Sequence, residues 1–180
     1  MNAANIISLA RLLSVPLTVW LILSGEWVAA FIWFAAAGLS DAVDGVLAKR
    51  FGMATELGGF LDPLADKALL VSIYVALGAQ GHLPNWLVIL VVSRDVLIVG
   101  GVLLSFAMAF DLAIRPLFIS KANTVAQIAL AAVVLGDLAG VPLPEIANLA
   151  LIVAVAATTL ASGASYLVIW ARGQSLDGGR

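Results

Sequence analysis

Residues 27–48 read WVAAFIWFAAAGLSDAVDGVLA, a run of 22 residues whose only charged members are Asp41 and Asp44. A helix of about 20 predominantly apolar residues is what a bilayer crossing requires. Breaks rich in glycine, proline and charge separate further apolar runs of similar length on both sides. The expected spans are 6–23, 27–48, 59–77, 85–105, 117–135 and 146–170. We therefore expect an all-α integral membrane bundle of six transmembrane helices.

The overall composition supports this fold class. Of the 180 residues, 63% are hydrophobic and 11% are charged, and the mean hydropathy is +1.11. A soluble globular domain is excluded, because such domains carry roughly 25% charged residues. Six spans use about 120 positions, so residues 1–180 are expected to form a single membrane domain. A net charge of −2 makes nucleic acid an unsuitable partner, and the lack of cysteine excludes thiolate metal sites and thiol nucleophiles.

The basic residues predict the orientation of the bundle. None of the nine lies in the first, third or fifth connection, where Glu26, His82, Asp137 and Glu145 occur instead. The second and fourth connections and the C-terminal tail hold or adjoin Lys49, Arg50, Lys67, Arg115, Lys121, Arg172 and Arg180. By the positive-inside rule, both termini and these two connections are cytoplasmic.

Four aspartates flank the second connection, with Asp41 and Asp44 before it and Asp62 and Asp66 after it. Residues three or four apart share one face of a helix, so each pair can present two carboxylates in one direction. Acidic groups in a span cost about 2.5–3.5 kcal/mol each and would also repel one another. Because no histidine or cysteine is nearby, the oxygen ligands favour Mg²⁺ or Mn²⁺, and four carboxylates can hold two such ions.

A structural interpretation of the same residues stays open. Asp62 followed by Pro63 is typical of a helix N-cap, and the aspartates could pair with Lys49, Arg50 and Lys67. Capping does not suit Asp41 and Asp44, because negative charge is unfavourable near a helix C-terminus. Gly45 and Gly58 also have two interpretations, either close approach of a bulky ligand or close packing of helices.

The spacing of these residues resembles the signature of the CDP-alcohol phosphatidyltransferases. That signature is Asp, two residues, Asp-Gly, two residues, Ala-Arg, eight residues, Gly, three residues, Asp, three residues, Asp. Seven of its eight positions are identical here, namely Asp41, Asp44, Gly45, Ala48, Gly58, Asp62 and Asp66. The departure is Lys49 in place of arginine, which keeps a positive charge but loses the bidentate fork.

The resemblance implies an enzyme that moves a phosphatidyl group from CDP-diacylglycerol to an alcohol and releases CMP. It assigns Asp41, Asp44, Asp62 and Asp66 to two metal ions and makes Asp66 the candidate general base. It assigns the CDP moiety to Asp44, Gly45, Ala48, Lys49 and Gly58. It also implies a homodimer. We expect the chain to lie in a bacterial inner membrane, with the site at the cytoplasmic face that the basic residues predict.

Other segments resemble the CMP-forming cardiolipin synthases most, and the phosphatidylglycerophosphate synthases next. These segments are 5–11, 61–67, 93–96 and 119–124 with Gln127. The resemblance implies phosphatidylglycerol as the acceptor, with glycerol 3-phosphate as the alternative. Four cations could turn toward the bundle interior and hold the acceptor's phosphate, namely Arg11, Arg94, Arg115 and Lys121.

Two of these cations have structural interpretations, since Arg94 beside Asp95 could form a buried pair and Arg115 could simply set the topology. A different function, a small cation-coupled transporter, would place its acidic site near mid-membrane with access from both sides. The aspartates here gather at one face, and this disfavours transport.

Overall fold

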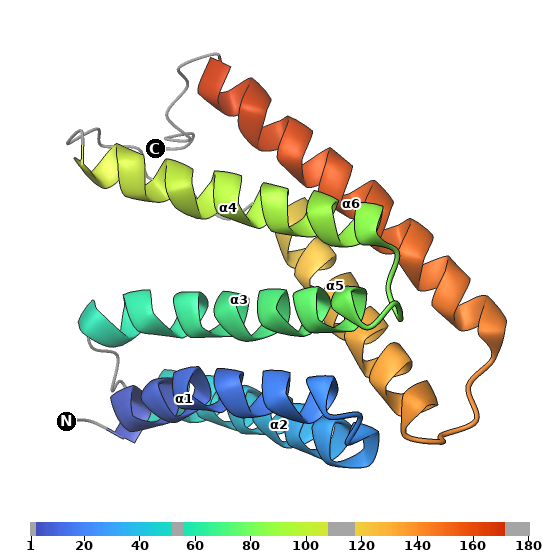
Figure 1. The fold of residues 1–180 in the computed structure, drawn as a ribbon. Helices are drawn as coiled ribbons and strands as arrows, with labels where there is room; N and C mark the ends of the chain where they lie inside the picture. Colours follow the sequence, from blue (N-terminus) through green and yellow to red (C-terminus); the bar gives the residue numbers. More distant parts are fainter. Residues whose placement is uncertain (1–2, 52–55, 108–117, 172–180) are drawn as a thin grey trace. The chain divides into compact units, whose positions relative to one another are not determined.

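The computed structural model describes the backbone of residues 3–51, 56–107 and 118–171, and the side chains of 13–40, 67–101, 118–144 and 146–168. The described residues form six α-helices and no strand (Figure 1). The helices are α1 (Ala3–Leu23), α2 (Trp27–Phe51), α3 (Glu56–Ala79), α4 (Asn85–Ala107), α5 (Phe118–Leu138) and α6 (Glu145–Ala171). The predicted all-α fold is confirmed, and each helix matches one predicted span to within three residues at either end.

Two helical segments within the described residues are long and apolar enough to cross a membrane, Phe118–Leu138 and Ile146–Val168. Shorter apolar segments occupy Leu13–Leu23, Trp27–Ser40 and Lys67–Ala79. Many large apolar side chains are exposed, among them Leu13, Ile89, Phe118 and Ile146. The membrane class therefore has support, while six crossings and cytoplasmic termini stay predictions.

The chain divides into two compact units, and the first comprises residues 1–83 and 131–144. In it, α1 contacts both α2 and α3. Ile22 of α1 and Ile73, Tyr74 and Leu77 of α3 are fully buried. The α3 positions follow the three- and four-residue spacing of one helix face, so this contact is largely apolar. Gln80, just past α3, adds a polar link, because its Nε2 donates to the carbonyl of Leu23 at 3.0 Å.

Three helices in this first unit end with the same backbone motif. At the end of α1, the amide of Gly25 donates to the carbonyl of Ile22, and the amide of Glu26 donates to that of Leu21. Gly25 has a φ of 74°, which a side chain would disfavour. The same pair of bonds closes α3 around Gly81 and α5 around Gly140. Each sequence break with such a glycine is therefore a defined helix stop.

The second unit comprises residues 84–130 and 145–180, and in it α4 contacts α6. One stripe of α4 is buried, beginning with Leu87 and Val91 and continuing with Arg94 and Asp95. The buried stripe of α6 holds Val155, Thr159 and Ser162. The first half of α5 buries Asn123 and Gln127. This unit therefore buries polar and charged groups among its helices.

Candidate active site

All eight signature positions lie on two consecutive helices. Asp41 and Asp44 are in α2, which continues to Phe51, and Asp62 and Asp66 are in α3, which begins at Glu56. The backbone is thus helical at all four aspartates, as the shared-face argument requires. Asp62 lies six residues after the first residue of α3 and is therefore not its N-cap. The capping interpretation loses the one residue it explained.

The connection between these helices limits how far apart their ends can be. Five chain steps separate Phe51 from Glu56, so their Cα atoms lie at most about 18 Å apart. Both helices belong to the same compact unit. The side chains of the four aspartates, and of Gly45, Ala48, Lys49 and Gly58, lie outside the described residues, so their convergence stays a prediction.

The donor set of the signature suits hard divalent cations. Mg²⁺ and Mn²⁺ prefer oxygen ligands such as carboxylates. The signature offers four carboxylates, in pairs three and four residues apart on a helical backbone. Among the side chains that the structure describes, no group of three acidic residues or histidines forms an alternative metal site. The residues of the signature therefore fit the expected cations.

Of the four cations predicted to hold the acceptor's phosphate, two have side chains that the structure describes and two do not. Arg11 lies in α1 but its side chain is outside the described part, and Arg115 is outside it altogether. Lys121 lies on the exposed side of α5 and does not face the bundle interior. Arg94 of α4 does face the interior, with 4% of its surface exposed.

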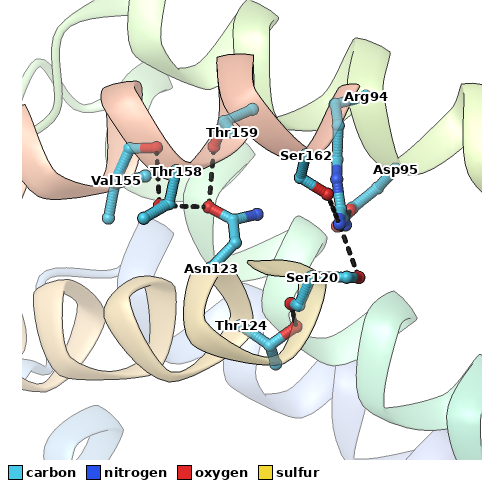
Figure 2. Close-up of polar contacts among 9 residues, drawn as sticks. All are labelled: Arg94, Asp95, Ser120, Asn123, Thr124, Val155, Thr158, Thr159 and Ser162. Atoms are coloured by element: carbon cyan, nitrogen blue, oxygen red, sulfur yellow. Dashed lines mark hydrogen bonds and ion pairs between the residues drawn. The ribbon is translucent and has the colours of Figure 1, made fainter. Parts of the chain in front are cut away.

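The guanidinium of Arg94 contacts side chains on three helices (Figure 2). Its Nη1 lies 2.6 Å from Oδ1 of Asp95 in a buried ion pair. Its Nη2 donates to Oγ of Ser120 on α5 at 2.6 Å and to Oγ of Ser162 on α6 at 2.5 Å. The geometry matches the buried structural pair that the sequence left open.

A second polar layer lies one helical turn away along α5 and α6. Oδ1 of Asn123 accepts from the hydroxyl of Thr159 at 2.9 Å and lies 2.8 Å from that of Thr158 (Figure 2). Asn123 and Ser120 are three residues apart, as are Thr159 and Ser162. Sequence reasoning gave no role to the α6 residues, although polar side chains at i, i+1 and i+4 in an apolar span predict a helix contact.

The family of this chain is shown by comparison with known proteins. A family model described as CDP-alcohol phosphatidyltransferase matches residues 1–163. The chain belongs to the CDP-alcohol phosphatidyltransferase family. The resemblance read from the signature is thereby confirmed, and this phosphatidyltransferase chain carries the signature on α2 and α3.

Its curated relatives carry two kinds of name. A chloroplastic CDP-diacylglycerol--glycerol-3-phosphate 3-phosphatidyltransferase 1 of Oryza sativa subsp. japonica is 36% identical over 152 residues, covering 75% of this chain and 46% of its own length. A cardiolipin synthase (CMP-forming) / mitochondrial hydrolase fusion protein of Schizosaccharomyces pombe is 38% identical over 183 aligned positions, covering 91% and 30%. A probable phosphatidylglycerophosphate synthase of Mycobacterium tuberculosis is 41% identical over 100 residues, covering 52% and 48%. The chain spans about half or less of these relatives.

Proposed function

We propose that this chain transfers a phosphatidyl group from CDP-diacylglycerol to a hydroxyl of phosphatidylglycerol, giving cardiolipin and CMP. The observation that carries the proposal is the signature, seven of whose eight positions are present on two consecutive helices of a family member. Membership in this family also favours a transferase over the cation transporter that the sequence left open.

The chemistry follows from what the aspartates can supply. The acceptor's hydroxyl oxygen bonds to the phosphorus that carries the diacylglycerol, and the bond from that phosphorus to CMP breaks. The carboxylate of Asp66 takes the hydroxyl proton, and CMP leaves with the electron pair. Divalent cations held by Asp41, Asp44, Asp62 and Asp66 would neutralise charge on the diphosphate. Asp44, Gly45, Ala48, Lys49 and Gly58 would bind the CDP moiety.

The role of Asp66 can be separated from that of a simple ligand. Asp66→Asn removes the proton acceptor but keeps the shape and one oxygen, so we expect kcat to fall by about a hundredfold or more. Binding of CDP-diacylglycerol, measured by calorimetry in detergent, should weaken far less. If binding is lost in parallel with the rate, Asp66 is only a ligand.

The location of the site follows from the topology that we propose. Six crossings with both termini in the cytoplasm place the α2–α3 connection at the cytoplasmic face, as the basic residues predict. The reactive groups of both lipids lie at headgroup depth, where this connection would be. We also propose a bacterial inner membrane as the location and a homodimer as the assembly, as the family resemblance implies.

Phosphatidylglycerol is proposed as the acceptor because the segments around Arg94 and Lys121 resemble cardiolipin synthases. Its phosphodiester carries one charge, whereas glycerol 3-phosphate is a dianion that calls for several converging cations. Beyond the signature, the cations that stay candidates for that phosphate are Arg11, Arg115 and Lys121. Glycerol 3-phosphate is the second candidate, favoured by the names of the rice and mycobacterial relatives.

One assay decides between the two acceptors. Purified protein is incubated with CDP-diacylglycerol and Mg²⁺ or Mn²⁺, and phosphatidylglycerol or glycerol 3-phosphate is offered separately. We expect cardiolipin and CMP from phosphatidylglycerol, identified by mass spectrometry of the lipid product. Phosphatidylglycerophosphate from glycerol 3-phosphate, with no cardiolipin from phosphatidylglycerol, would establish the second candidate instead.

A further inference from the structure

The buried polar layer around Arg94 lies at a meeting point of three helices. Arg94 is in the middle of α4, Ser120 is the third residue of α5, and Ser162 is in the second half of α6. Both serine hydroxyls lie within 2.6 Å of the same guanidinium nitrogen. A single side chain therefore links α4 to the other two helices.

The hydrogen bonds of the guanidinium leave it poorly suited to a phosphate. A phosphate is held best by two parallel N–H groups on one edge of the guanidinium. The Nη2 atom has two N–H bonds, and two serine oxygens already lie within bonding distance. Nη1 is engaged with Asp95, and Nε is buried with no hydrogen-bond partner among the described residues. A bidentate phosphate would have to displace a serine or the carboxylate.

The same contacts explain the orientation of Lys121. Successive residues on a helix are about 100° apart, so drawing Ser120 inward turns its neighbour away. Lys121 is indeed exposed, while Asn123 and Gln127 on the side of Ser120 are fully buried. The rotation of α5 is thus fixed at Ser120 by Arg94 and one turn later by Asn123, which meets Thr159 of α6.

We propose that Arg94 is a positioning residue, which ties α5 and α6 to α4 and so sets the rotation of α5 that presents Lys121 to the acceptor's phosphate. Arg94 itself does not bind that phosphate. Asp95 neutralises the buried charge, which makes the link tolerable at membrane depth. The proposal rests on the proposed function, because Lys121 is taken there as a contact of the acceptor.

The test is a double-mutant cycle between Arg94 and Lys121. Arg94→Lys keeps the charge beside Asp95 but offers no fork to reach both serines. We expect the KM for phosphatidylglycerol to rise about tenfold, with kcat and the KM for CDP-diacylglycerol within about twofold. Added to Lys121→Ala, Arg94→Lys should raise this KM no further, because both changes remove the same contact. Multiplying effects, or an unchanged KM in Arg94→Lys, would overturn the proposal.

Serine variants keep the test decisive if Arg94→Lys does not fold. Ser120→Ala removes one link without touching the charge pair, and it should raise the same KM without adding to Lys121→Ala. Ser165→Ala is the matched control, because within the described part of the chain Ser165 donates to the carbonyl of Ala161 in its own helix α6. If Ser120→Ala behaves like Ser165→Ala, the proposal is wrong.

Failure of the proposed function gives a different result. If wild-type protein uses glycerol 3-phosphate, the same cycle is measured with that acceptor. If it uses neither acceptor, the thermal midpoint in detergent still compares Ser120→Ala with Ser165→Ala. If only Ser120→Ala has a lower midpoint, the link between the helices is supported but the role of Lys121 is rejected. If the two variants have equal midpoints, both the link and the role of Lys121 are rejected.

Discussion

Asp95 and the signature aspartates are two settings of acidic residues on the helices of this chain, and we expect their charge to be compensated in different ways. Asp95 is buried beside Arg94, and the pair is completed by hydroxyls from two other helices. Residues 41–67 contain five acidic and three basic residues, so the signature region has an excess of negative charge. The charge of Asp95 is balanced within the protein, whereas the excess charge of the signature aspartates is what the proposed divalent cations would balance.

On this proposal the Arg94–Asp95 pair is structural and the signature aspartates are functional. A buried acid with its own cation contributes to helix packing, and removing either partner leaves an unpaired charge. If the signature aspartates converge as we propose, they would repel one another until cations bind. Substitutions at the signature should therefore lower activity without lowering stability, whereas substitutions at the Arg94–Asp95 pair should lower stability.

The largest effect is expected at the signature. Asp62→Asn removes one proposed metal ligand, so CMP release should fall by at least about a hundredfold. In chelator the thermal midpoint of this variant should equal or exceed that of wild type, because one of several like charges is gone. Scanning fluorimetry beside a CMP assay measures both. A normal rate, or a marked loss of stability, would remove the distinction between the two settings.

Asp95→Asn should show the reverse pattern. It leaves the guanidinium of Arg94 buried without a counter-charge, which costs about 3–5 kcal/mol of stability. Reversible unfolding in mixed micelles measures this loss. Replacing both partners, as in Arg94→Met/Asp95→Leu, should recover most of it, since apolar residues of similar volume avoid the unpaired charge. If the double variant is no more stable than Asp95→Asn, charge balance is not what the pair provides.

The smallest effect is expected in the second polar layer, around Asn123. Asn123→Ala removes the acceptor shared by Thr158 and Thr159, and hydrogen bonds between membrane helices contribute about 0.6–1.7 kcal/mol. Thr158 keeps a partner in the carbonyl of Ala154, which limits the loss. Val125→Ala, on the exposed side of α5, is the control in the same unfolding assay. A loss as large as that of Asp95→Asn would show that charge is not what distinguishes the layers.

The helices themselves were predictable because hydropathy and glycine breaks are local signals. The span predicted at 27–48 is α2 from Trp27, and the break at Ser24-Gly25-Glu26 is a helix stop with its own hydrogen bonds. At the polar break between α2 and α3, both helices extend beyond the predicted spans 27–48 and 59–77. α2 continues to Phe51 and α3 begins at Glu56. Hydropathy marks the part that suits lipid, whereas backbone hydrogen bonding continues beyond it.

The role of Arg94 could not be settled from the sequence. Both roles, a phosphate ligand and a member of a buried ion pair, are consistent with an arginine in a span. The sequence shows only that Asp95 follows Arg94 directly. Ser120 and Ser162, which decide the geometry, are 26 and 68 residues away. Only the packing of α4, α5 and α6 brings them together. The signature aspartates were the opposite case, because their meaning lies in a spacing that can be read directly.

The metal dependence of CMP release is the decisive measurement for the proposed divalent cation site. Wild-type protein is supplied with CDP-diacylglycerol and phosphatidylglycerol, first in excess chelator and then with rising Mg²⁺ or Mn²⁺. We expect no CMP above background in chelator and full recovery when free cation is restored, with Asp62→Asn recovering little or nothing over the same range. Full turnover in excess chelator would contradict the assignment of these aspartates to a divalent cation site.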